Sequence, residues 1–389
     1  MRSHSIVRPV LALCALLLLT GCWNKYELTD WIFVQAAAID KTEDDKIRLT
    51  TYFYRPTGGT NEEGGAAPIN SAYASVQTEA KTLHEAVRDI LMHAGRKAQW
   101  SHMRVILIGE PLAKERNIKE ILDFFARDHE PRGTVSIQIT NGAASPYLNK
   151  KPLIEQTLGQ EFKHSEAETQ RFAGKSLSST LLELSIQLLS ESNVGVLPYV
   201  YNDKLNPTIL TVGGVALLRD GKLKKVLPAD TGTEALLMLM NKYKEGVIEY
   251  TCEDKADRQG TESFEVTRFQ SKIRPVLKGN EVSVVISVKA EGIIGELRCS
   301  QLITPEDEQA ITLKIQKTIE AQMKETMQLL QKQKLDAIGI ANKIYARHPY
   351  KWKKLKPEWE QRFAELSVDY DIKVKISGTG MNTGKPFGE

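Results

Sequence analysis

The first 22 residues of the chain decide where the rest of it can fold. Arg2 and Arg8 precede an apolar run over residues 10–19, and the run ends in LTGC at residues 19–22. A positive start, an apolar core of about ten residues and a small-residue end are typical of an export signal. Such a run is too short to cross a hydrocarbon core about 30 Å thick as a helix. The rest of the chain is therefore expected to fold in water outside the cytoplasmic membrane.

The LTGC ending matches the bacterial lipobox. In that motif the cysteine thiol, here Cys22, receives a diacylglycerol thioether, and cleavage after Gly21 exposes an amine that is acylated as well. One acyl chain anchors a protein only marginally, whereas two or three chains on one residue hold it firmly. Residues 1–21 are thus predicted to be a removed lipoprotein signal peptide. The alternative is a plain signal peptide, or an uncleaved anchor, in which Cys22 follows Gly21 by chance.

The amino-acid composition limits the kinds of protein that the rest of the chain can form. The 389 residues include 52 Lys and Arg against 49 Asp and Glu, and 41% are hydrophobic. These values are ordinary for a globular protein of two or three domains. A formal net charge of +3 gives no support for a nucleic-acid partner, which calls for clustered basic residues. No later segment reaches about 18 consecutive apolar residues, so the chain is expected to be tethered to a membrane and not to span it.

Residues 22–200 are predicted to form an N-terminal mixed α/β domain. Alternating apolar residues indicate strands, and apolar residues at spacings of three and four indicate helices. An alternation of the two is typical of a mixed α/β fold. A glycine-rich stretch over residues 57–68 is expected to be a surface loop. The predicted strands cover residues 31–40, 47–55, 72–78, 103–108 and 135–139, and the helical segments cover 82–91, 110–126 and 153–191.

Residues 201–389 are predicted to form a C-terminal mixed α/β domain, with a further division near 260–300 left open. The boundary is placed in the turn-rich segment 193–207. Thr304 and Pro305 start a long helix that runs toward Tyr345 with an interruption near Gly339. The fold class is therefore α+β, or mixed α/β, with mixed sheets, helices packed on them and one long helix in the C-terminal half. The other predicted elements are a hairpin over 209–218 and 223–227, helices over 233–243 and 358–366, and strands over 246–252, 262–272, 281–289, 293–299 and 368–376.

Two cysteines remain in the predicted ectodomain. Cys14 leaves with the signal and Cys22 is acylated, so Cys252 and Cys299 are the thiols left in an oxidising setting. Both lie in strand-like segments. The sequence leaves open whether they form a disulfide or remain two buried thiols, because it does not fix their separation in space.

Motifs for catalysis or metal binding receive no support. Residues 174–176 (GKS) end like a phosphate loop, but Thr169 stands where the first glycine belongs, so a polar turn or helix surface is favoured. His93 and His102 are the closest approach to a metal pair, without an H-E-x-x-H motif or a Cys/His cluster beside them. No G-x-S-x-G elbow is present. We therefore predict no catalytic, cofactor-binding or metal residues.

Two segments could serve as partner or lipid surfaces. Residues 350–359 are basic with interleaved aromatics, which would suit anionic headgroups, but the favoured interpretation places Trp352 and Trp359 in the core with the lysines in solvent. The apolar stripe of the helix over residues 306–345 could fill a partner's groove. It is interpreted instead as a core face that covers the C-terminal sheet.

Short motifs are distributed along nearly the whole chain. They are Cys22-Trp23-Asn24-Lys25-Tyr26-Glu27-Leu28, Ala38-Ile39-Asp40, Trp100-Ser101-His102, 105–110 (VILIGE), Ile121-Leu122-Asp123-Phe124, Arg127-Asp128, Val196-Leu197-Pro198, Leu335-Asp336-Ala337-Ile338-Gly339, His348-Pro349-Tyr350-Lys351-Trp352 and Trp359. In their order and spacing these segments resemble the Ger(x)C lipoprotein family, the C subunits of spore nutrient germination receptors. Each motif is loose, and their order and spacing give the resemblance its specificity. Two places depart from the family pattern: His129 stands where a proline often follows Arg-Asp, and residues 337–339 stand where a Phe-Gly pair is frequent.

The resemblance implies a non-enzymatic subunit anchored through Cys22 to the outer face of the spore inner membrane, or to the cell membrane during sporulation. Its implied partners are two integral-membrane proteins: an A subunit, and a B subunit similar to amino-acid permeases. It implies several mixed α/β domains and no catalytic or metal residues. A lipoprotein solute-binding subunit of an importer is the first alternative, although such proteins usually have two similar lobes. An anchored hydrolase is the second.

Overall fold

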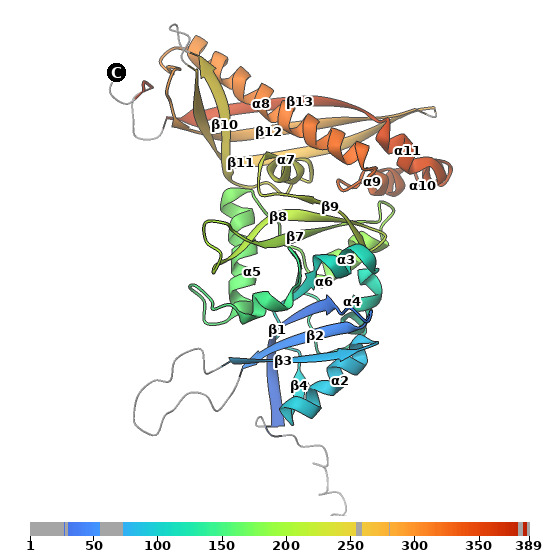
Figure 1. Cartoon of the computed structure of the whole chain (residues 1–389). Coiled ribbons are helices and arrows are strands. Elements are labelled where there is room, and N and C mark those ends of the chain that lie inside the picture. The colour runs from blue at the N-terminus through green and yellow to red at the C-terminus, as the bar shows by residue number, and fades with distance from the viewer. Residues whose placement is uncertain are drawn as a thin grey trace, which may run out of the picture.

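The computed structural model describes Glu27 and residues 30–54, 73–253, 259–279, 281–379 and 384–386. These residues form two β-sheets with helices packed on them, and Figure 1 shows one sheet above the other. This architecture confirms the predicted mixed α+β class. The predicted loop over residues 57–68 and the predicted lipidation site at Cys22 lie outside the described residues.

The larger sheet is mixed and has nine strands. They are β1 (Trp31–Lys41), β2 (Ile47–Tyr54), β3 (Tyr73–Ala80), β4 (Lys97–Gln99), β5 (Val105–Gly109), β6 (Ser136–Thr140), β7 (Val194–Asn202), β8 (Leu210–Arg219) and β9 (Lys222–Leu227). Their order is β3-β2-β1-β5-β6-β7-β8-β9, and β4 pairs with β1. The strands β1, β5, β6 and β7 run parallel, and antiparallel strands lie on both sides of them.

Helices cover both faces of this sheet. On one face, α2 (Leu83–Ala94), α3 (Glu110–Glu115), α4 (Ile118–Arg127) and α6 (Leu181–Leu189) share a core with the inward side chains of the strands. On the other face lie the short helix η3 (Ser145–Asn149) and α5 (Leu158–Glu168), which continues into a π-helical turn, η4 (Thr169–Ala173). Coverage of both faces explains why β5 and β6 are buried along their whole length.

Local signals in the sequence account for several element boundaries. The Thr82 hydroxyl accepts a hydrogen bond from the Glu85 N–H and caps α2, as expected from its position before the apolar pattern. The turn between β8 and β9 places Asp220 and Gly221 at φ of 50° and 75°. Asp-Gly favours this left-handed turn, whose twist matches paired strands. The predicted hairpin over this region is confirmed.

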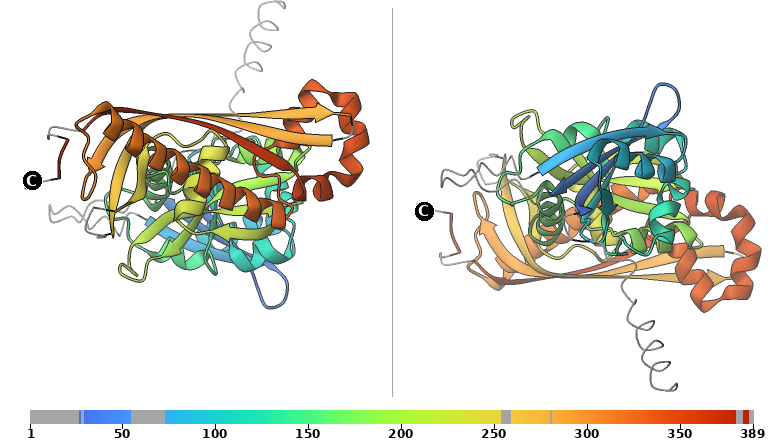
Figure 2. Two further views of the ribbon diagram at one scale, coloured as in Figure 1. Left: turned by 90° about the horizontal axis from the view of Figure 1, so that it is seen from above. Right: turned by 90° about the horizontal axis from the view of Figure 1, so that it is seen from below.

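The smaller sheet is built around two long strands. Its members are β10 (Gly246–Glu253), β11 (Gln259–Lys278), β12 (Glu281–Glu296) and β13 (Ser367–Gly378), in that order. The first three run antiparallel, and β13 lies parallel to β12. One long helix, α8 (Pro305–Lys332), crosses one face of the sheet, as both views in Figure 2 show. A group of short helices closes the end of that face: α9 (Ile340–Arg347), α10 (Pro349–Leu355), η5 (Lys356–Glu358) and α11 (Trp359–Ala364).

The long helix α8 begins and packs as its sequence predicts. Thr304 and Asp307 form a capping box at its start, with each side chain accepting from the other's backbone N–H. Its apolar stripe faces the four-stranded sheet, so the interpretation as a core face is confirmed. The buried residues of the stripe are Ile311, Ile315, Ile319, Met323, Met327 and Leu330.

A short helix joins the two sheets. In α7 (Thr231–Leu239) every residue from Thr233 to Leu239 is buried, so this helix is enclosed on all sides. One continuous apolar cluster contains Leu236 and Leu237 together with residues of both sheets, for example Leu217 of β8 and Phe264 of β11. The two sheets are therefore held by a shared core as well as by surface contacts.

Two predicted helices are each broken into separate pieces. The segment 110–126 forms α3 and α4, because Arg116 is extended and the Asn117 side chain caps the second helix by accepting from the Lys119 N–H. The segment 153–191 forms α5, the turn η4 and α6. Gly174, in the left-handed region at φ 64°, ends the first of these helical stretches, and Thr180 caps α6.

The predicted strands over residues 281–289 and 293–299 are a single strand, β12. Gly292 lies where that sequence pattern is interrupted, and a side chain there would collide with the Glu265 backbone carbonyl of β11. Glycine thus allows close approach at an irregularity in the β11–β12 register, and the strand continues through it.

The first sheet extends beyond the predicted domain boundary near residue 200. Pro198, taken as a turn former, lies inside β7 next to a register shift, where a strand tolerates proline. The hairpin β8–β9, assigned to the second module from sequence, pairs with β7 in the first sheet. The two sheets part between β9 and β10. Where the chain divides into folding domains stays a prediction.

Candidate functional site

The predicted anchor and the described fold meet at the start of β1. Trp31, the first residue of that strand, pairs with Lys97 of β4, which follows the C-terminal end of α2. Figure 1 shows these three elements together at the lower end of the molecule. We call this region, made of Trp31, residues 88–97 and the groove described next, the tether-proximal end.

A groove of about 170 Å³ opens between α2 and the segment from α4 to residue 130. Its floor is apolar: Trp100, 2% exposed, contacts Phe125 edge to face with ring centroids 5.4 Å apart. Phe124 and His84 line the groove with their rings 5.4 Å apart. An aromatic floor of this kind can receive a flat or apolar group.

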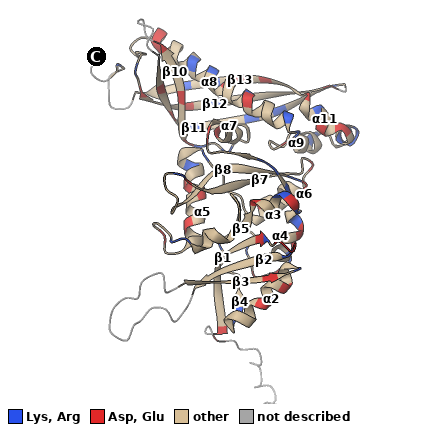
Figure 3. Ribbon diagram, viewed as in Figure 1, with Lys and Arg blue, Asp and Glu red and all other residues tan. Residues whose placement is uncertain are grey.

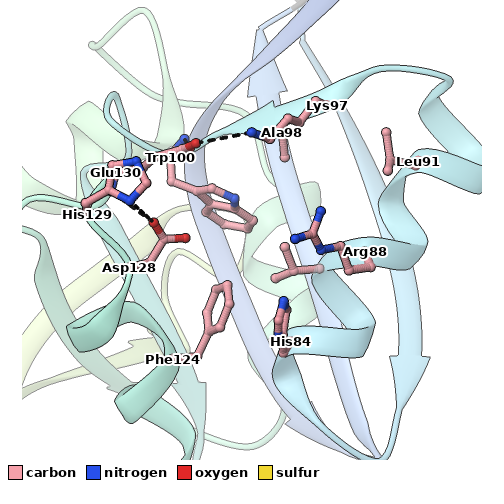
Figure 4. A pocket seen from close by; sticks show the side chains of 11 residues that line it. His84, Arg88, Leu91, Lys97, Ala98, Trp100, Phe124, Asp128, His129 and Glu130 are labelled. Carbon is pink, nitrogen blue, oxygen red and sulfur yellow. Dashed lines mark hydrogen bonds and ion pairs between the residues drawn. The ribbon is translucent and has the colours of Figure 1, made fainter.

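The walls of the groove carry charges of both signs. Glu130 accepts a hydrogen bond from the Trp100 backbone N–H at 3.1 Å, and its other carboxylate oxygen lies 3.7 Å from the Lys97 ammonium. Asp128 accepts from the Glu130 N–H at 3.0 Å. Figure 4 shows Arg88 directed over the groove toward Trp100. The acidic groups thus have partners within the groove, and Arg88 has no ion-pair partner among the described residues.

Aromatic rings on the floor and charges of both signs on the walls suit the binding of a group that has an apolar part and a charged part. The groove could not be predicted from the sequence. Its lining residues come from segments separated by about forty positions, and only Trp100, Phe124 and Asp128 belong to segments that resemble the family pattern.

In the part of the chain that the structure describes, His93 and His102 belong to no group of three or more side chains with metal-ligand spacing. His102 packs edge to face against Phe33 with ring centroids 5.3 Å apart, and His93 lies in the last turn of α2. Among the described residues, Cys252, Glu262 and Cys299 form the one group with metal-ligand spacing. Its two sulfurs are joined in a disulfide, which takes them out of consideration as thiolate ligands.

The Cys252–Cys299 disulfide resolves the alternative that the sequence left open. The two cysteines are 47 positions apart, and their Cα atoms lie 5.9 Å from each other. Beside the bridge, Glu262 accepts hydrogen bonds from the backbone N–H groups of residues 298, 299 and 300 at 2.7–3.0 Å. Burial alone would raise the pKa of Glu262, but these donors outweigh it and lower the pKa. The carboxylate and the disulfide together fix the chain after β12.

The GKS segment is structural, as favoured from sequence. Gly174 follows a π-helical turn and not a buried strand, and a side chain there would collide with the Tyr243 ring. Ser176 is fully buried, and its hydroxyl donates to the Gly214 carbonyl at 3.4 Å. The segment therefore has neither the strand nor the open backbone of a phosphate loop.

The basic aromatic segment over residues 350–359 also follows its structural interpretation. Trp352 and Trp359 are buried and pack edge to face with ring centroids 5.2 Å apart. Lys351, Lys353 and Lys354 are exposed. In the view of Figure 3, positions of Lys and Arg and positions of Asp and Glu both occur along the described helices.

A buried aspartate organises the helices that carry these tryptophans. Asp336 accepts hydrogen bonds from the N–H groups of Ile340 and Ala341 at 2.8 and 2.7 Å and from Trp359 Nε1 at 3.2 Å. It caps α9 from a position three residues before Gly339, whose φ is 69°. Burial raises the pKa of Asp336, and the three donors oppose that rise. The sequence analysis noted this segment as family-like without assigning a role to the carboxyl group.

A second buried carboxyl group lies between α5 and the first sheet. Glu166 accepts from the Ser136 hydroxyl at 2.5 Å and from the Gln138 amide at 2.7 Å, both on β6. Burial raises the pKa of Glu166 to about 7, and these hydrogen bonds limit the rise. Glu166 is therefore protonated in the folded protein at pH values where an exposed glutamate is ionised.

We predict that Glu166→Gln reduces the pH dependence of stability. The folded state holds the Glu166 proton up to a pKa of about 7, whereas unfolded glutamate releases it near 4.5, so stability falls as pH rises through this interval. At about 1.4 kcal/mol per pKa unit, the contribution is about 3 kcal/mol. Urea unfolding at a series of pH values measures it.

The matched control for Glu166→Gln is Glu168→Gln, an exposed position on the same helix. Its pH profile should follow that of the unchanged protein. Parallel profiles for Glu166→Gln and Glu168→Gln would show that the buried proton has no energetic role.

Comparisons with known proteins cover nearly the whole chain. Residues 24–201 match the family model "Spore germination protein N-terminal domain", and residues 213–380 match "Spore germination B3/GerAC like, C-terminal". Spore germination protein KC of Bacillus subtilis (strain 168) is 27% identical over 394 residues, covering 96% of this chain and 95% of that protein. Spore germination protein B3 of the same strain is 26% identical and covers 94% and 96%.

A solved structure shares the fold. The structure titled "Crystal Structure of the GerBC protein" superposes with a TM-score of 0.55 at 24% identity, covering 88% of this chain and 96% of that one. At this identity the likeness concerns the fold alone.

Proposed function

Because this chain belongs to the Ger(x)C family of spore germination proteins, we propose that it is a lipid-anchored, non-enzymatic subunit of a nutrient germinant receptor. In this role it assembles with integral-membrane A and B subunits and contributes to the initiation of germination. The observation that carries the proposal is the match along both halves of the chain to spore germination proteins, together with the lipobox at residues 19–22.

The proposed location is the outer face of the spore inner membrane, or the cell membrane during sporulation, through acyl chains on Cys22. No helix among the described residues has the length and apolar character needed to cross a bilayer. The lipobox supplies the proposed attachment instead, since two or three acyl chains on one residue anchor a protein stably.

The proposed role is assembly and not catalysis. Three of the most buried carboxyl groups cap backbone N–H groups: Asp40 accepts from residues 144 and 145, and Glu262 and Asp336 cap the segments described above. Carboxylates that are engaged in this way hold the fold and are poor candidates for proton transfer. These contacts support a structural use of the buried polar groups.

Exposed apolar side chains on α6 offer a surface for partner subunits. Leu182, Ile186 and Leu189 are 58%, 61% and 83% exposed, and their spacing places them on one face of the helix. The opposite face, with Leu181, Leu184 and Leu188, is buried in the first core. Because a common membrane anchor raises the effective concentration of the subunits, weak contacts at such a surface would suffice for assembly.

Co-purification from detergent-solubilised spore membranes tests the proposal. We expect the A and B subunits to be recovered with this chain, and recovery of an importer ATPase in their place would contradict it. Solute-binding subunits of importers, the alternative, usually have two similar lobes around a ligand cleft. The nine-stranded mixed sheet and the four-stranded sheet of this chain differ in strand number and order, which favours the receptor subunit.

A further inference from the structure

The tether-proximal end has features that point to direct contact with the bilayer. This inference rests on the proposed lipid anchor. Cys22 and Trp31 are nine positions apart, so the chain between them spans at most about 30 Å even when fully extended. Trp31 pairs with Lys97. The last turn of α2, which ends two residues before Arg96, therefore lies at the end of the molecule that the proposed anchor keeps within about 30 Å of the membrane.

Two large apolar side chains are exposed at this place. Met92 is 72% exposed and Leu91 is 43% exposed, whereas Leu83, Ala86 and Ile90 on the other face of α2 are buried. Both exposed residues lie in the last turn of the helix, within five or six residues of Lys97. Apolar side chains on a surface that is held near lipid can enter the boundary between headgroups and acyl chains.

Basic side chains surround these apolar residues. Arg88 is exposed and lies one turn before Met92, and Arg96 follows the helix. Neither arginine has an ion-pair partner within the described ranges. Lys97 is shared between Glu130, at 3.7 Å, and the Trp31 ring, at 4.8 Å from its centroid. The two unpaired guanidinium groups match the phosphates of anionic lipids in charge and geometry.

Acidic groups are present here as well, and they offset the positive charge of the basic side chains. Glu85 is exposed one turn before Arg88, and Asp89 is half-buried beside it. Glu130 is engaged by Lys97 and by the Trp100 N–H. Arg88, Arg96 and Lys97 are balanced by Glu85, Asp89, Asp128 and Glu130, so the end is amphipathic and has no net positive charge. Its apolar residues supply most of the contact, and its arginines supply the preference for anionic headgroups.

We propose that the tether-proximal end docks on the bilayer, with Leu91 and Met92 entering the headgroup layer and Arg88 and Arg96 facing the phosphates of anionic phospholipids. The acyl anchor then fixes the position of the molecule, and this second contact fixes its orientation. Two attachment points at one end would hold the smaller sheet away from the membrane, at the far end in Figure 1.

A spin label on the full-length acylated chain tests the docking. The proposed acylation of Cys22 and the Cys252–Cys299 disulfide leave a cysteine placed at residue 92 as the free thiol of the mature chain. The Met92→Cys protein carries a nitroxide and is reconstituted into vesicles of phosphatidylcholine with phosphatidylglycerol. We expect its collision rate with a water-soluble nickel chelate to be several-fold lower than at the control position.

The control position is Leu189→Cys. Leu189 is 83% exposed at the end of α6. The nearby Ser192 N–H donates to Asn342 of α9 at 3.0 Å, so residue 189 lies toward the smaller sheet and away from the proposed docking surface. A second variant, Arg88→Gln with Arg96→Gln, should lose part of the protection at residue 92 on vesicles that contain phosphatidylglycerol. The protein that keeps both arginines should lose the same part of the protection at residue 92 when the vesicles contain phosphatidylcholine alone.

The outcomes separate the anchor from the docking. A chain that floats with vesicles but shows equal nickel accessibility at residues 92 and 189 is anchored without docking, and overturns this inference alone. Equal protection at residue 92 with and without the arginines overturns the proposed lipid preference. A chain that does not float with vesicles contradicts the lipid anchor, and the docking proposal fails with it.

Discussion

Replacement of Cys22 by alanine is expected to release the chain from membranes. The proposed acyl chains supply about 0.8 kcal/mol for each buried CH₂, far more than the few exposed apolar side chains of the folded part can supply. In cell fractionation the variant protein should therefore be found in the soluble fraction, whereas the unchanged protein should be found in the membrane pellet. Nutrient-triggered germination should be strongly impaired, because partner contacts would lose the gain in effective concentration.

The control for Cys22→Ala is a measurement that shows that the ectodomain of the variant is still folded. Thermal unfolding of the released protein should match that of the anchored protein, because residue 22 lies before the described fold. Mass spectrometry of the unchanged mature chain should show an acylated N-terminal cysteine. Normal germination with a fully soluble variant, or an unmodified Cys22 in the mature protein, would refute the proposed anchor.

Replacement of Asp336 by alanine is expected to destabilise the second half of the molecule by about 3 kcal/mol. The change leaves the N–H groups of Ile340 and Ala341 and the indole N–H of Trp359 buried without an acceptor. A buried donor left unpaired costs about 1–3 kcal/mol, and relaxation recovers part of the total for three. Asp336→Asn, which keeps one acceptor oxygen, should lose less stability. Urea unfolding followed by tryptophan fluorescence measures the order of these variants.

The matched control for Asp336→Ala is Asp369→Ala. Asp369 is exposed on β13, in the same half of the molecule, and its replacement should change the free energy of unfolding by less than about 0.5 kcal/mol. If Asp336→Ala and Asp369→Ala unfold at the same urea concentration, the cap on α9 does not stabilise the fold.

The fold could be predicted from the sequence where short-range signals decide it. Thr82 and Thr304 are N-cap residues that predict the starts of helices, and Asp220-Gly221 predicts a hairpin turn. The apolar stripe on α8 predicts which face of that helix is buried. These features depend on residues within one or two turns of each other. The resemblance along the chain supplied the family, which the comparisons confirm.

Long-range contacts explain what the sequence could not supply. The continuity of β12 through Gly292 depends on the carbonyl of Glu265 on a neighbouring strand. The pairing of Cys252 with Cys299 and the hydrogen bond from the Trp359 indole N–H to Asp336 depend on where separate segments meet. The groove lined by Trp100 and Arg88 is assembled in the same way. The periodicity of apolar residues within one segment gives no information about contacts between distant segments.

The enclosed helix α7 has a mechanical consequence. Because its leucines belong to an apolar cluster that both sheets share, neither sheet can swivel against the other without uncovering that cluster to water. The two sheets should therefore move together as one rigid unit, and with the proposed lipid anchor in place this unit would pivot at the tether-proximal end. A force applied to the smaller sheet would then be transmitted to the tether-proximal end as a torque, because the core shared by the two sheets resists bending.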